Sequence, residues 1–245
     1  MSATVTWPVF HAGLLNRETI VERTMSFRFA KPADGSYRAG QFVDITLLDP
    51  PETDAEGNTR GFSISSAPRD GAGGRRTGLR SSPAAQRHLL EHVLEGRIAQ
   101  AGRDHDHVHA DRPAVLLAGG IGITPFRSIL VETIGGGSLP FRVVLFHANR
   151  RPEGAAFADE CRALEHTDPN LTFVPTMTAT AGSTHAWGGE QGHIDAAMLG
   201  RHLDGLIDPI YNVAGPAGMV QASRAMLVAS GVDEDDIRTE EFTGY

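Results

Sequence analysis

Hydrophobic and polar positions follow different rhythms in the two halves of the chain. In the first half, apolar and polar residues alternate over 25–29 and again over 43–47, and Phe62 and Ile64 repeat the spacing. A period of two predicts half-buried strands. The stretches 31–40 and 49–58 contain Pro and Gly and are predicted to be loops. Short strands separated by such loops predict a small antiparallel barrel.

In the second half, strands alternate with helices. The continuous apolar run 114–118 predicts a strand buried on both faces. Further strands are predicted over 142–146, 171–174, 210–213 and 237–242, and helices over 126–133, 155–164 and 217–229. This order predicts a parallel α/β domain. We therefore expect a barrel domain at 1–111, irregular over 69–111, followed by an α/β domain at 112–245.

Composition narrows the possible partners. The formal net charge of −8 disfavours nucleic-acid binding, which depends on Lys and Arg neutralising phosphates. The single cysteine, Cys161, excludes an internal disulfide and a cluster held by four thiolates. It is expected to be a small core residue. The chain shows no secretory leader and no apolar run long enough to span a bilayer, so we expect a cytoplasmic protein without a membrane partner.

A glycine-rich turn at 118–125 links the first strand of the second half to a helix. Gly119, Gly120 and Gly122 allow close approach of the backbone to a ligand, and the helix N-terminus favours an anion such as a pyrophosphate. Pro125 suits the first helical position. This context indicates a nucleotide site, and the alternative is a tight turn without a ligand.

Two further stretches carry candidate chemistry. A second glycine turn, 214–219, follows another predicted strand and would form the opposite wall of the same crevice, unless the pairing is accidental. The stretch 60–68 contains Arg60, which offers a fork of donors to a phosphate, and Phe62, whose flat ring suits a flavin. Alone, this stretch is equally well read as a strand with Phe62 in the core.

Taken in order, these motifs resemble the ferredoxin–NADP reductase superfamily over nearly the whole chain. Arg60-Gly61-Phe62-Ser63 is similar to the family's Arg-x-Tyr-Ser flavin motif, and 119–125 matches its nucleotide loop. The stretches 38–42, 215–216 and 240–242 resemble its strand entry, its Gly-Pro turn and its C-terminal signature. The resemblance implies an antiparallel β-barrel FAD-binding domain followed by a parallel α/β Rossmann-like NAD(P)-binding domain.

The resemblance also implies roles in flavin binding. Arg60 would bind the FAD pyrophosphate, Phe62 would pack on the flavin, and Ser63 would face flavin N5 as a catalytic residue. The remaining implied flavin ligands are Ser65 and Ser66 on the flavin-lining strand and Ser82 at the start of a helix predicted over 84–94.

NADH or NADPH is the implied hydride donor. The implied nucleotide-binding residues are Gly119, Gly120, Gly122, Thr124, Pro125, Arg150, Gly215, Pro216 and Met219. Phe242 or Tyr245 would cover the flavin, and Glu241 joins Phe242 and Ser63 as a catalytic candidate. No acidic residue ends the second strand to bind a ribose 2′-OH, and Arg150 could meet a 2′-phosphate, so the choice of nucleotide stays open.

The chain departs from the family at two places. Ala214 stands where many members have Cys beside the nicotinamide, which implies slower hydride transfer. The segment 69–111 has no recognisable glycine–proline turn, which leaves FAD retention open. Within it, His105, His107 and His109 are interpreted as part of a solvated loop, and no metal site is predicted.

The function predicted from these features is electron transfer from NAD(P)H through FAD to a separate acceptor. The acceptor would be a ferredoxin or other iron–sulfur protein, a flavodoxin, an oxygenase component or a small oxidant such as a quinone. The alternative is a degraded flavin module that acts as a non-catalytic NAD(P)-binding or assembly protein. The sequence predicts no oligomeric state.

Overall fold

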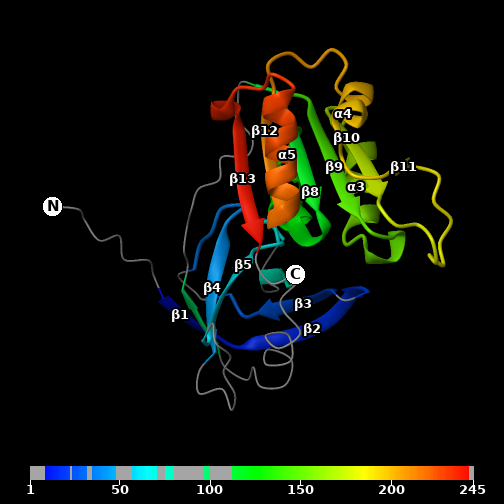
Figure 1. Cartoon of the computed structure of the whole chain (residues 1–245). Coiled ribbons are helices and arrows are strands. Elements are labelled where there is room, and N and C mark those ends of the chain that lie inside the picture. The colour runs from blue at the N-terminus through cyan, green and yellow to red at the C-terminus, as the bar shows by residue number, and fades with distance from the viewer. Residues whose placement is uncertain are drawn as a thin grey trace.

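The computed structural model describes residues 9–22, 24–31, 35–47, 57–70, 75–79, 96–99 and 112–242. They form a barrel-like part built from the first half of the chain and an α/β part built from the second half (Figure 1). The predicted helix over 84–94 and the histidines of 105–109 lie outside the described residues. Among the described helices, none is long and apolar enough to cross a membrane.

Two antiparallel sheets make up the first part. One has the order β1-β7-β4-β5 and the other the order β2-β3-β6. Their strands are β1 (Val9–Ala12), β2 (Leu14–Val21), β3 (Thr24–Phe29), β4 (Phe42–Leu47), β5 (Thr59–Ser63), β6 (Arg75–Leu79) and β7 (Gly96–Ala99). The apolar residues that alternate along β3, β4 and β5 meet in one core, which contains Ala12, Phe27, Phe29, Val43, Ile45, Phe62 and Ile64. The predicted period of two is thus confirmed as the source of this core.

A six-stranded parallel sheet forms the second part, with the order β11-β10-β9-β8-β12-β13. Its strands are β8 (Ala114–Gly119), β9 (Val143–Asn149), β10 (Leu171–Met177), β11 (Glu190–Gln191), β12 (Ile210–Pro216) and β13 (Ile237–Phe242). The helices are α2 (Ile123–Gly135), α3 (Ala158–Thr167), α4 (Ala196–His202) and α5 (Ala217–Ala229), with short 3-10 turns at Gly120–Gly122, Pro152–Gly154 and Glu234–Asp236. The predicted fold class is therefore confirmed.

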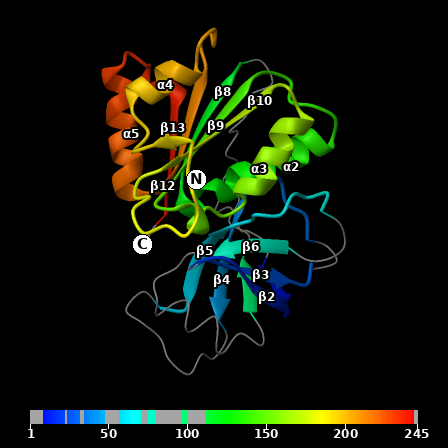
Figure 2. The same ribbon diagram turned by 90° about the vertical axis from the view of Figure 1, so that its right-hand side faces the viewer.

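The α/β part is three layers thick. Helices α2 and α3 cover one face of the sheet, and α4 and α5 cover the other (Figure 2). Strand β8 is buried along its whole length because its side chains enter both cores alternately: Leu116 packs with α2, whereas Leu117 packs with α4 and α5. Cys161 lies in the first core, fully buried, and burial raises the pKa of its thiol to about 12, as expected for a core residue.

Element boundaries differ from the predicted ones where local backbone geometry intervenes. Helix α2 begins at Ile123, so Pro125 is its third residue and not its first. Helix α3 begins at Ala158, three residues later than predicted, because Phe157 adopts a left-handed conformation with φ 62° that no helix start can include. Helix α4 and the short strand β11 were not predicted.

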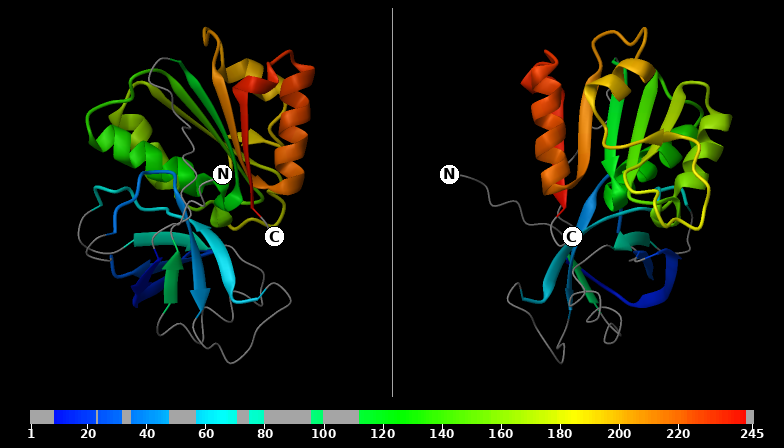
Figure 3. Two further views of the ribbon diagram at one scale, coloured as in Figure 1. Left: turned by 90° about the vertical axis from the view of Figure 1, so that its left-hand side faces the viewer. Right: turned by 45° about the vertical axis from the view of Figure 1, so that its right-hand side comes forward.

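The carboxyl ends of the parallel strands point toward the barrel-like part (Figures 1 and 3). The strand order reverses at β8, because β9 lies on one side of it and β12 on the other. Ligands of open α/β sheets bind at such a switch point, beyond the carboxyl ends of the strands. This topology places the two glycine turns, which follow β8 and β12, next to each other and near the barrel.

Candidate functional site

A cavity of about 730 Å³ opens at the switch point. The turns after β8 and β12 supply its two walls, the end of β9 supplies its far side, and the hairpin between β2 and β3 closes it from the barrel. The cavity is lined by residues that include Glu22, Thr24, Gly119, Gly120, Asn149, Arg150, Arg151, Pro216 and Met219. An elongated polar ligand such as a nucleotide fits a cavity of this size and lining.

The two glycine turns pack against each other too closely for side chains. A Cβ atom on Gly122 would lie 2.1 Å from the carbonyl oxygen of Ala214, and one on Gly119 would lie 2.2 Å from Sδ of Met219. Of the predicted nucleotide residues, Gly119, Gly120, Arg150, Pro216 and Met219 line the cavity. Gly122, Thr124, Pro125 and Gly215 do not line it. Gly122 and Gly215 pack against the opposite turn, and Thr124 and Pro125 are buried in the first turn of α2.

Two side-chain contacts hold the first glycine turn. The Thr124 hydroxyl donates to the carbonyl oxygen of Ile121 at 2.7 Å. Nε2 of His147, on β9, donates to the carbonyl oxygen of Gly120 at 2.9 Å, and the ring is fully buried. Burial lowers the pKa of His147 to about 4, so the ring is neutral at physiological pH. Sequence reasoning missed His147, because its partner lies 27 residues away on a different element.

The end of β9 presents an unsatisfied donor to the cavity. Asn149 is 7% exposed, and its Nδ2 atom has no hydrogen-bond partner among the described residues. A buried amide without a partner is costly, so Asn149 is a candidate for contact with a ligand in the cavity that it lines. Arg150 and Arg151 follow directly, whereas Glu22 approaches from the barrel hairpin.

The predicted flavin motif lies on β5 and just beyond it. The guanidinium of Arg60 donates to the carbonyl oxygens of Gly57 and Thr59 at 2.9 and 2.8 Å. Phe62 is 6% exposed and belongs to the barrel core. The main-chain carbonyls of Ser65 and Ser66 accept hydrogen bonds from helix α2, so these two residues join the two parts of the molecule. Ser82 and Tyr245 lie outside the described residues.

Ser63 and Glu240 meet at the seam between the two parts. The Ser63 hydroxyl is buried, and neither it nor Oε2 of Glu240 has a hydrogen-bond partner of good geometry in the described part of the chain. Burial raises the pKa of Glu240 to about 7, and the neighbouring Ser63 hydroxyl lowers it in part. Glu240 pairs with Ala214 across β12 and β13, which places the carboxyl beside the glycine turns.

The C-terminal candidates separate according to the alternation of β13. Glu241 is exposed, whereas Phe242 is partly buried against the sheet core. Glu240 is therefore the acidic residue of this strand that faces Ser63, whereas the sequence had offered Glu241 as a catalytic candidate. The alternation along the strand does not by itself decide between Glu240 and Glu241, because the two side chains lie on opposite faces of β13.

Comparisons with known proteins agree with this geometry. Residues 116–225 match the family model described as the oxidoreductase NAD-binding domain. The chain is 29% identical over 252 residues to the flavohemoprotein of a Burkholderia species (strain TH2), covering 98% of this chain and 61% of the relative. It is 25% identical over 246 residues to the glycine betaine monooxygenase reductase subunit of Chromohalobacter salexigens, covering 92% of this chain and 61% of the relative. The chain thus spans about three fifths of these relatives.

Solved structures share the fold over almost the whole chain. The FAD/NAD-binding domain of nitric oxide dioxygenase from Vibrio cholerae has a TM-score of 0.73 at 21% identity, covering 95% of this chain and 98% of that one. A ferredoxin–NADP⁺ reductase from Neisseria gonorrhoeae with bound FAD and NADP has a TM-score of 0.72 at 19% identity, covering 95% and 98%. With the family match over residues 116–225 and the paired glycine turns, these likenesses show that the chain has the two-part fold of FAD- and NAD(P)-binding reductases, in agreement with the resemblance to the ferredoxin–NADP reductase superfamily.

Proposed function

We propose that the chain is a reductase module that takes electrons from NADH or NADPH through FAD and passes them to a separate acceptor. The observation that carries the proposal is the buried Ser63 hydroxyl, which lies beside Glu240 and has no hydrogen bond of good geometry among the described residues. The pairing of Glu240 with Ala214 puts this pair at the end of the sheet where the nucleotide cavity opens. A nucleotide and a flavin bound at these places would meet at the seam.

The residues present fit FAD at this seam. The Ser63 hydroxyl and Oε2 of Glu240 have no hydrogen bond of good geometry among the described residues, so both can serve as polar partners for a ligand at this seam. Arg60 lies at the start of the same strand, partly exposed, where its guanidinium can exchange main-chain carbonyls for a phosphate. When bound, FAD would supply the acceptance of a hydride and the release of single electrons.

The chain's own residues would bind the nucleotide, orient the flavin and hold a proton. The glycine turns let backbone N–H groups approach a pyrophosphate at the start of α2, and His147 holds Gly120 in place for this contact. The Ser63 hydroxyl would orient the flavin ring through a hydrogen bond. Glu240, whose pKa is about 7, would hold a proton at the seam near neutral pH.

The acceptor is proposed by analogy with relatives. One relative is the reductase subunit of glycine betaine monooxygenase. Structures of the same fold include the ferredoxin reductase of carbazole 1,9a-dioxygenase and a cytochrome P450 reductase from Amycolatopsis. We therefore favour an oxygenase component or an iron–sulfur protein on a separate chain, ahead of a flavodoxin or a small oxidant. The alternative of a non-catalytic NAD(P)-binding or assembly module predicts binding without electron transfer.

Flavin reduction tests the proposal directly. The purified chain, saturated with FAD, is titrated anaerobically with NADH and with NADPH while the flavin absorbance is followed. We expect at least one nucleotide to bleach the flavin, and Arg60→Ala to weaken FAD binding because a charge-assisted phosphate contact is lost. If nucleotide binds but neither form reduces the flavin, the non-catalytic alternative is favoured and the proposal fails.

A further inference from the structure

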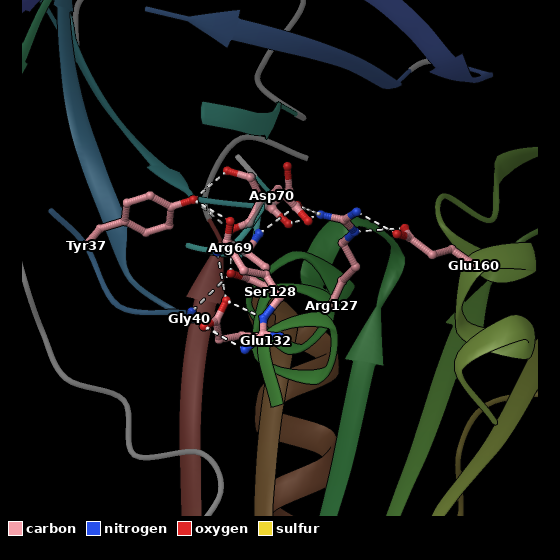
Figure 4. Close-up of polar contacts among 11 residues, drawn as sticks. Tyr37, Gly40, Arg69, Asp70, Arg127, Ser128, Glu132 and Glu160 are labelled. Atoms are coloured by element: carbon pink, nitrogen blue, oxygen red, sulfur yellow. Dashed lines mark hydrogen bonds and ion pairs between the residues drawn. The ribbon is translucent and has the colours of Figure 1, made fainter. Parts of the chain in front are cut away.

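One face of helix α2 is joined to the barrel segment 65–70 by two buried polar contacts and one exposed contact (Figure 4). We call this set of contacts the α2 clamp; its helix residues are Arg127, Ser128 and Glu132. The same helix begins at the glycine turn that lines the nucleotide cavity. The segment 65–70 begins two residues after Ser63. The clamp therefore connects the two elements that would hold the two cofactors.

Arg127 is the centre of the clamp. Its side chain is 5% exposed, and its Nη1 donates to the main-chain carbonyl of Ser65. Nε and Nη2 bind the two carboxylate oxygens of Glu160, on α3, at 2.8 and 2.6 Å. Oδ2 of Asp70, on the barrel segment, lies 3.5 Å from Nη1. Burial alone would lower the pKa of Arg127, but Glu160 and Asp70 raise it overall, so the guanidinium stays charged.

Two neighbours extend the clamp along the helix. The Ser128 hydroxyl donates to the main-chain carbonyl of Ser66 at 2.7 Å. One turn further, Oε2 of Glu132 accepts from the backbone N–H of Arg69 at 3.0 Å. Tyr37 supports the barrel side, because its hydroxyl donates to the carbonyl of Ala67 at 2.9 Å. The helix thus holds consecutive carbonyls of the segment that follows Ser63.

The chemistry of the clamp suits positioning better than simple stabilisation. The Arg127–Glu160 ion pair is expected to contribute little net stability, because Arg127 loses its solvation on burial while Glu160, whose side chain is 37% exposed, remains screened by water. A guanidinium fork that binds a carboxylate through two bonds fixes direction as well as distance. The carbonyl of Ser65 is a further directional contact on the same guanidinium. The Arg127 guanidinium therefore restricts the orientation of the barrel segment 65–70 relative to helix α2.

We propose that Arg127 is a positioning residue, which with Ser128 holds the Ser65 and Ser66 carbonyls so that Ser63 keeps a fixed place relative to the Gly119–Gly122 turn. This inference rests on the proposed reductase function and names the residue that sets its geometry. Arg127 does not line the nucleotide cavity itself. Hydride transfer requires near-contact alignment, and a displacement of about 1 Å is enough to cost up to about 100-fold in rate.

The test compares Arg127→Lys, which keeps the charge and loses the fork, with the parent and with Arg201→Lys. Arg201 also binds a Glu in a two-bond pair, with Glu190 at 3.1 and 2.7 Å, but within the α/β part alone. Ser128→Ala is a second, milder variant that removes one hydroxyl. Anaerobic stopped-flow reduction of the FAD-saturated proteins gives the reduction rate and the nucleotide dissociation constant separately.

Hydrogen exchange adds a readout that does not depend on turnover. Exchange of the peptide covering 63–70 is measured by mass spectrometry in flavin-free protein and compared with the peptide covering α5. For Arg127→Lys we expect reduction to slow by about 10- to 100-fold with the nucleotide dissociation constant changed less than about twofold, and exchange of 63–70 to accelerate. Ser128→Ala should show the same pattern to a smaller degree, and Arg201→Lys should match the parent in both measurements.

The outcomes separate the two proposals. A parent that no nucleotide reduces would overturn the proposed function and the positioning role with it. A parent that is reduced, with Arg127→Lys and Ser128→Ala reduced at the parent rate, would overturn the positioning role alone, even if exchange of 63–70 accelerates. A loss of rate accompanied by an equal loss in Arg201→Lys would also reject it, because the effect would then not belong to the clamp.

Discussion

Nε2 of His147 lies 2.9 Å from the carbonyl oxygen of Gly120, and this contact ties the second strand of the parallel sheet to the glycine turn of the first. The ring is fully buried, and burial lowers its pKa to about 4. The contact therefore depends on a neutral ring whose Nε2 carries the proton. Acidification therefore lowers the stability of the folded chain, because His147 takes up a proton in the unfolded chain at a pH where it stays neutral in the folded chain.

His147→Gln is expected to remove this pH dependence while an amide N–H can still reach Gly120. The folded-state pKa lies below the unfolded value of 6.5, so the parent should lose stability as pH falls from about 6.5 toward 4. The difference between those pKa values, 6.5 and about 4, corresponds to on the order of 3 kcal/mol. Chemical denaturation of both proteins at pH 7 and pH 4.5 measures this loss of unfolding free energy. An equal loss in the parent and in His147→Gln would contradict the prediction.

Glu240→Gln should reveal a dependence of stability on pH that is opposite in sign to that of His147. The pKa of Glu240 is raised from 4.5 to about 7, so the parent loses stability as pH rises from about 4.5 to 7, because the unfolded chain releases this proton while the folded chain still holds it. The variant cannot ionise, so relative to the parent it should gain on the order of 3 kcal/mol at pH 8 and little at pH 4.5, by the same conversion. Glu241→Gln, at an exposed position, is the control and should change stability little at either pH. Equal effects of the two variants would show that Glu240 is solvated.

Gly122→Ala should disrupt the packed pair of glycine turns. The new Cβ would lie 2.1 Å from the backbone oxygen of Ala214, which cannot move without displacing β12. We expect a loss of about 3 kcal/mol or more in the free energy of unfolding, together with weaker nucleotide binding.

Gly200→Ala, within α4, is the matched control for Gly122→Ala. No atom lies within 4 Å of its added Cβ, so it should gain up to about 1 kcal/mol from helix propensity. Chemical denaturation and titration with NADH and NADPH compare the two variants. A Gly122→Ala protein as stable as Gly200→Ala would show that the turns are not in this contact.

Asn149→Asp is expected to shift nucleotide preference toward NADH. The unsatisfied amide at the end of β9 would be replaced by a carboxylate, which accepts from a ribose 2′-OH and repels a 2′-phosphate. The ratio of the NADPH to the NADH dissociation constant should rise by about tenfold or more, since a tenfold change needs only about 1.4 kcal/mol. Fluorescence titration with both nucleotides gives this ratio. An unchanged ratio would place the adenosine ribose elsewhere in the cavity.

Ser63→Ala tests the chemistry at the seam. If the hydroxyl hydrogen-bonds the flavin at the hydride-accepting atom, its loss should slow flavin reduction by about 10²-fold, while FAD and nucleotide affinities change little. Stopped-flow reduction of flavin-saturated proteins measures this. If Ser63 instead satisfies only a structural need, the variant would lose stability or FAD, and the remaining holoprotein would be reduced at the normal rate.

Local patterns in the sequence determined the architecture. The period of two along β3 and β4 predicted the barrel core around Phe27, Phe29 and Val43, and the apolar run of β8 predicted a strand buried on both faces. Helix α5 and strand β13 occupy the predicted ranges. The two glycine turns could also be predicted, because a turn that joins a strand to a helix at close quarters needs residues without side chains at fixed spacing.

Only the tertiary structure decided which polar groups meet. Glu240 and Glu241 are equivalent in the sequence pattern, and the packing of β13 beside β12 selected Glu240 to face Ser63. His147 and Arg127 act on carbonyls 27 and 62 residues away. Backbone carbonyls exist at every residue and leave no trace in the sequence, so contacts to them follow from the folded arrangement of the elements and not from any local pattern.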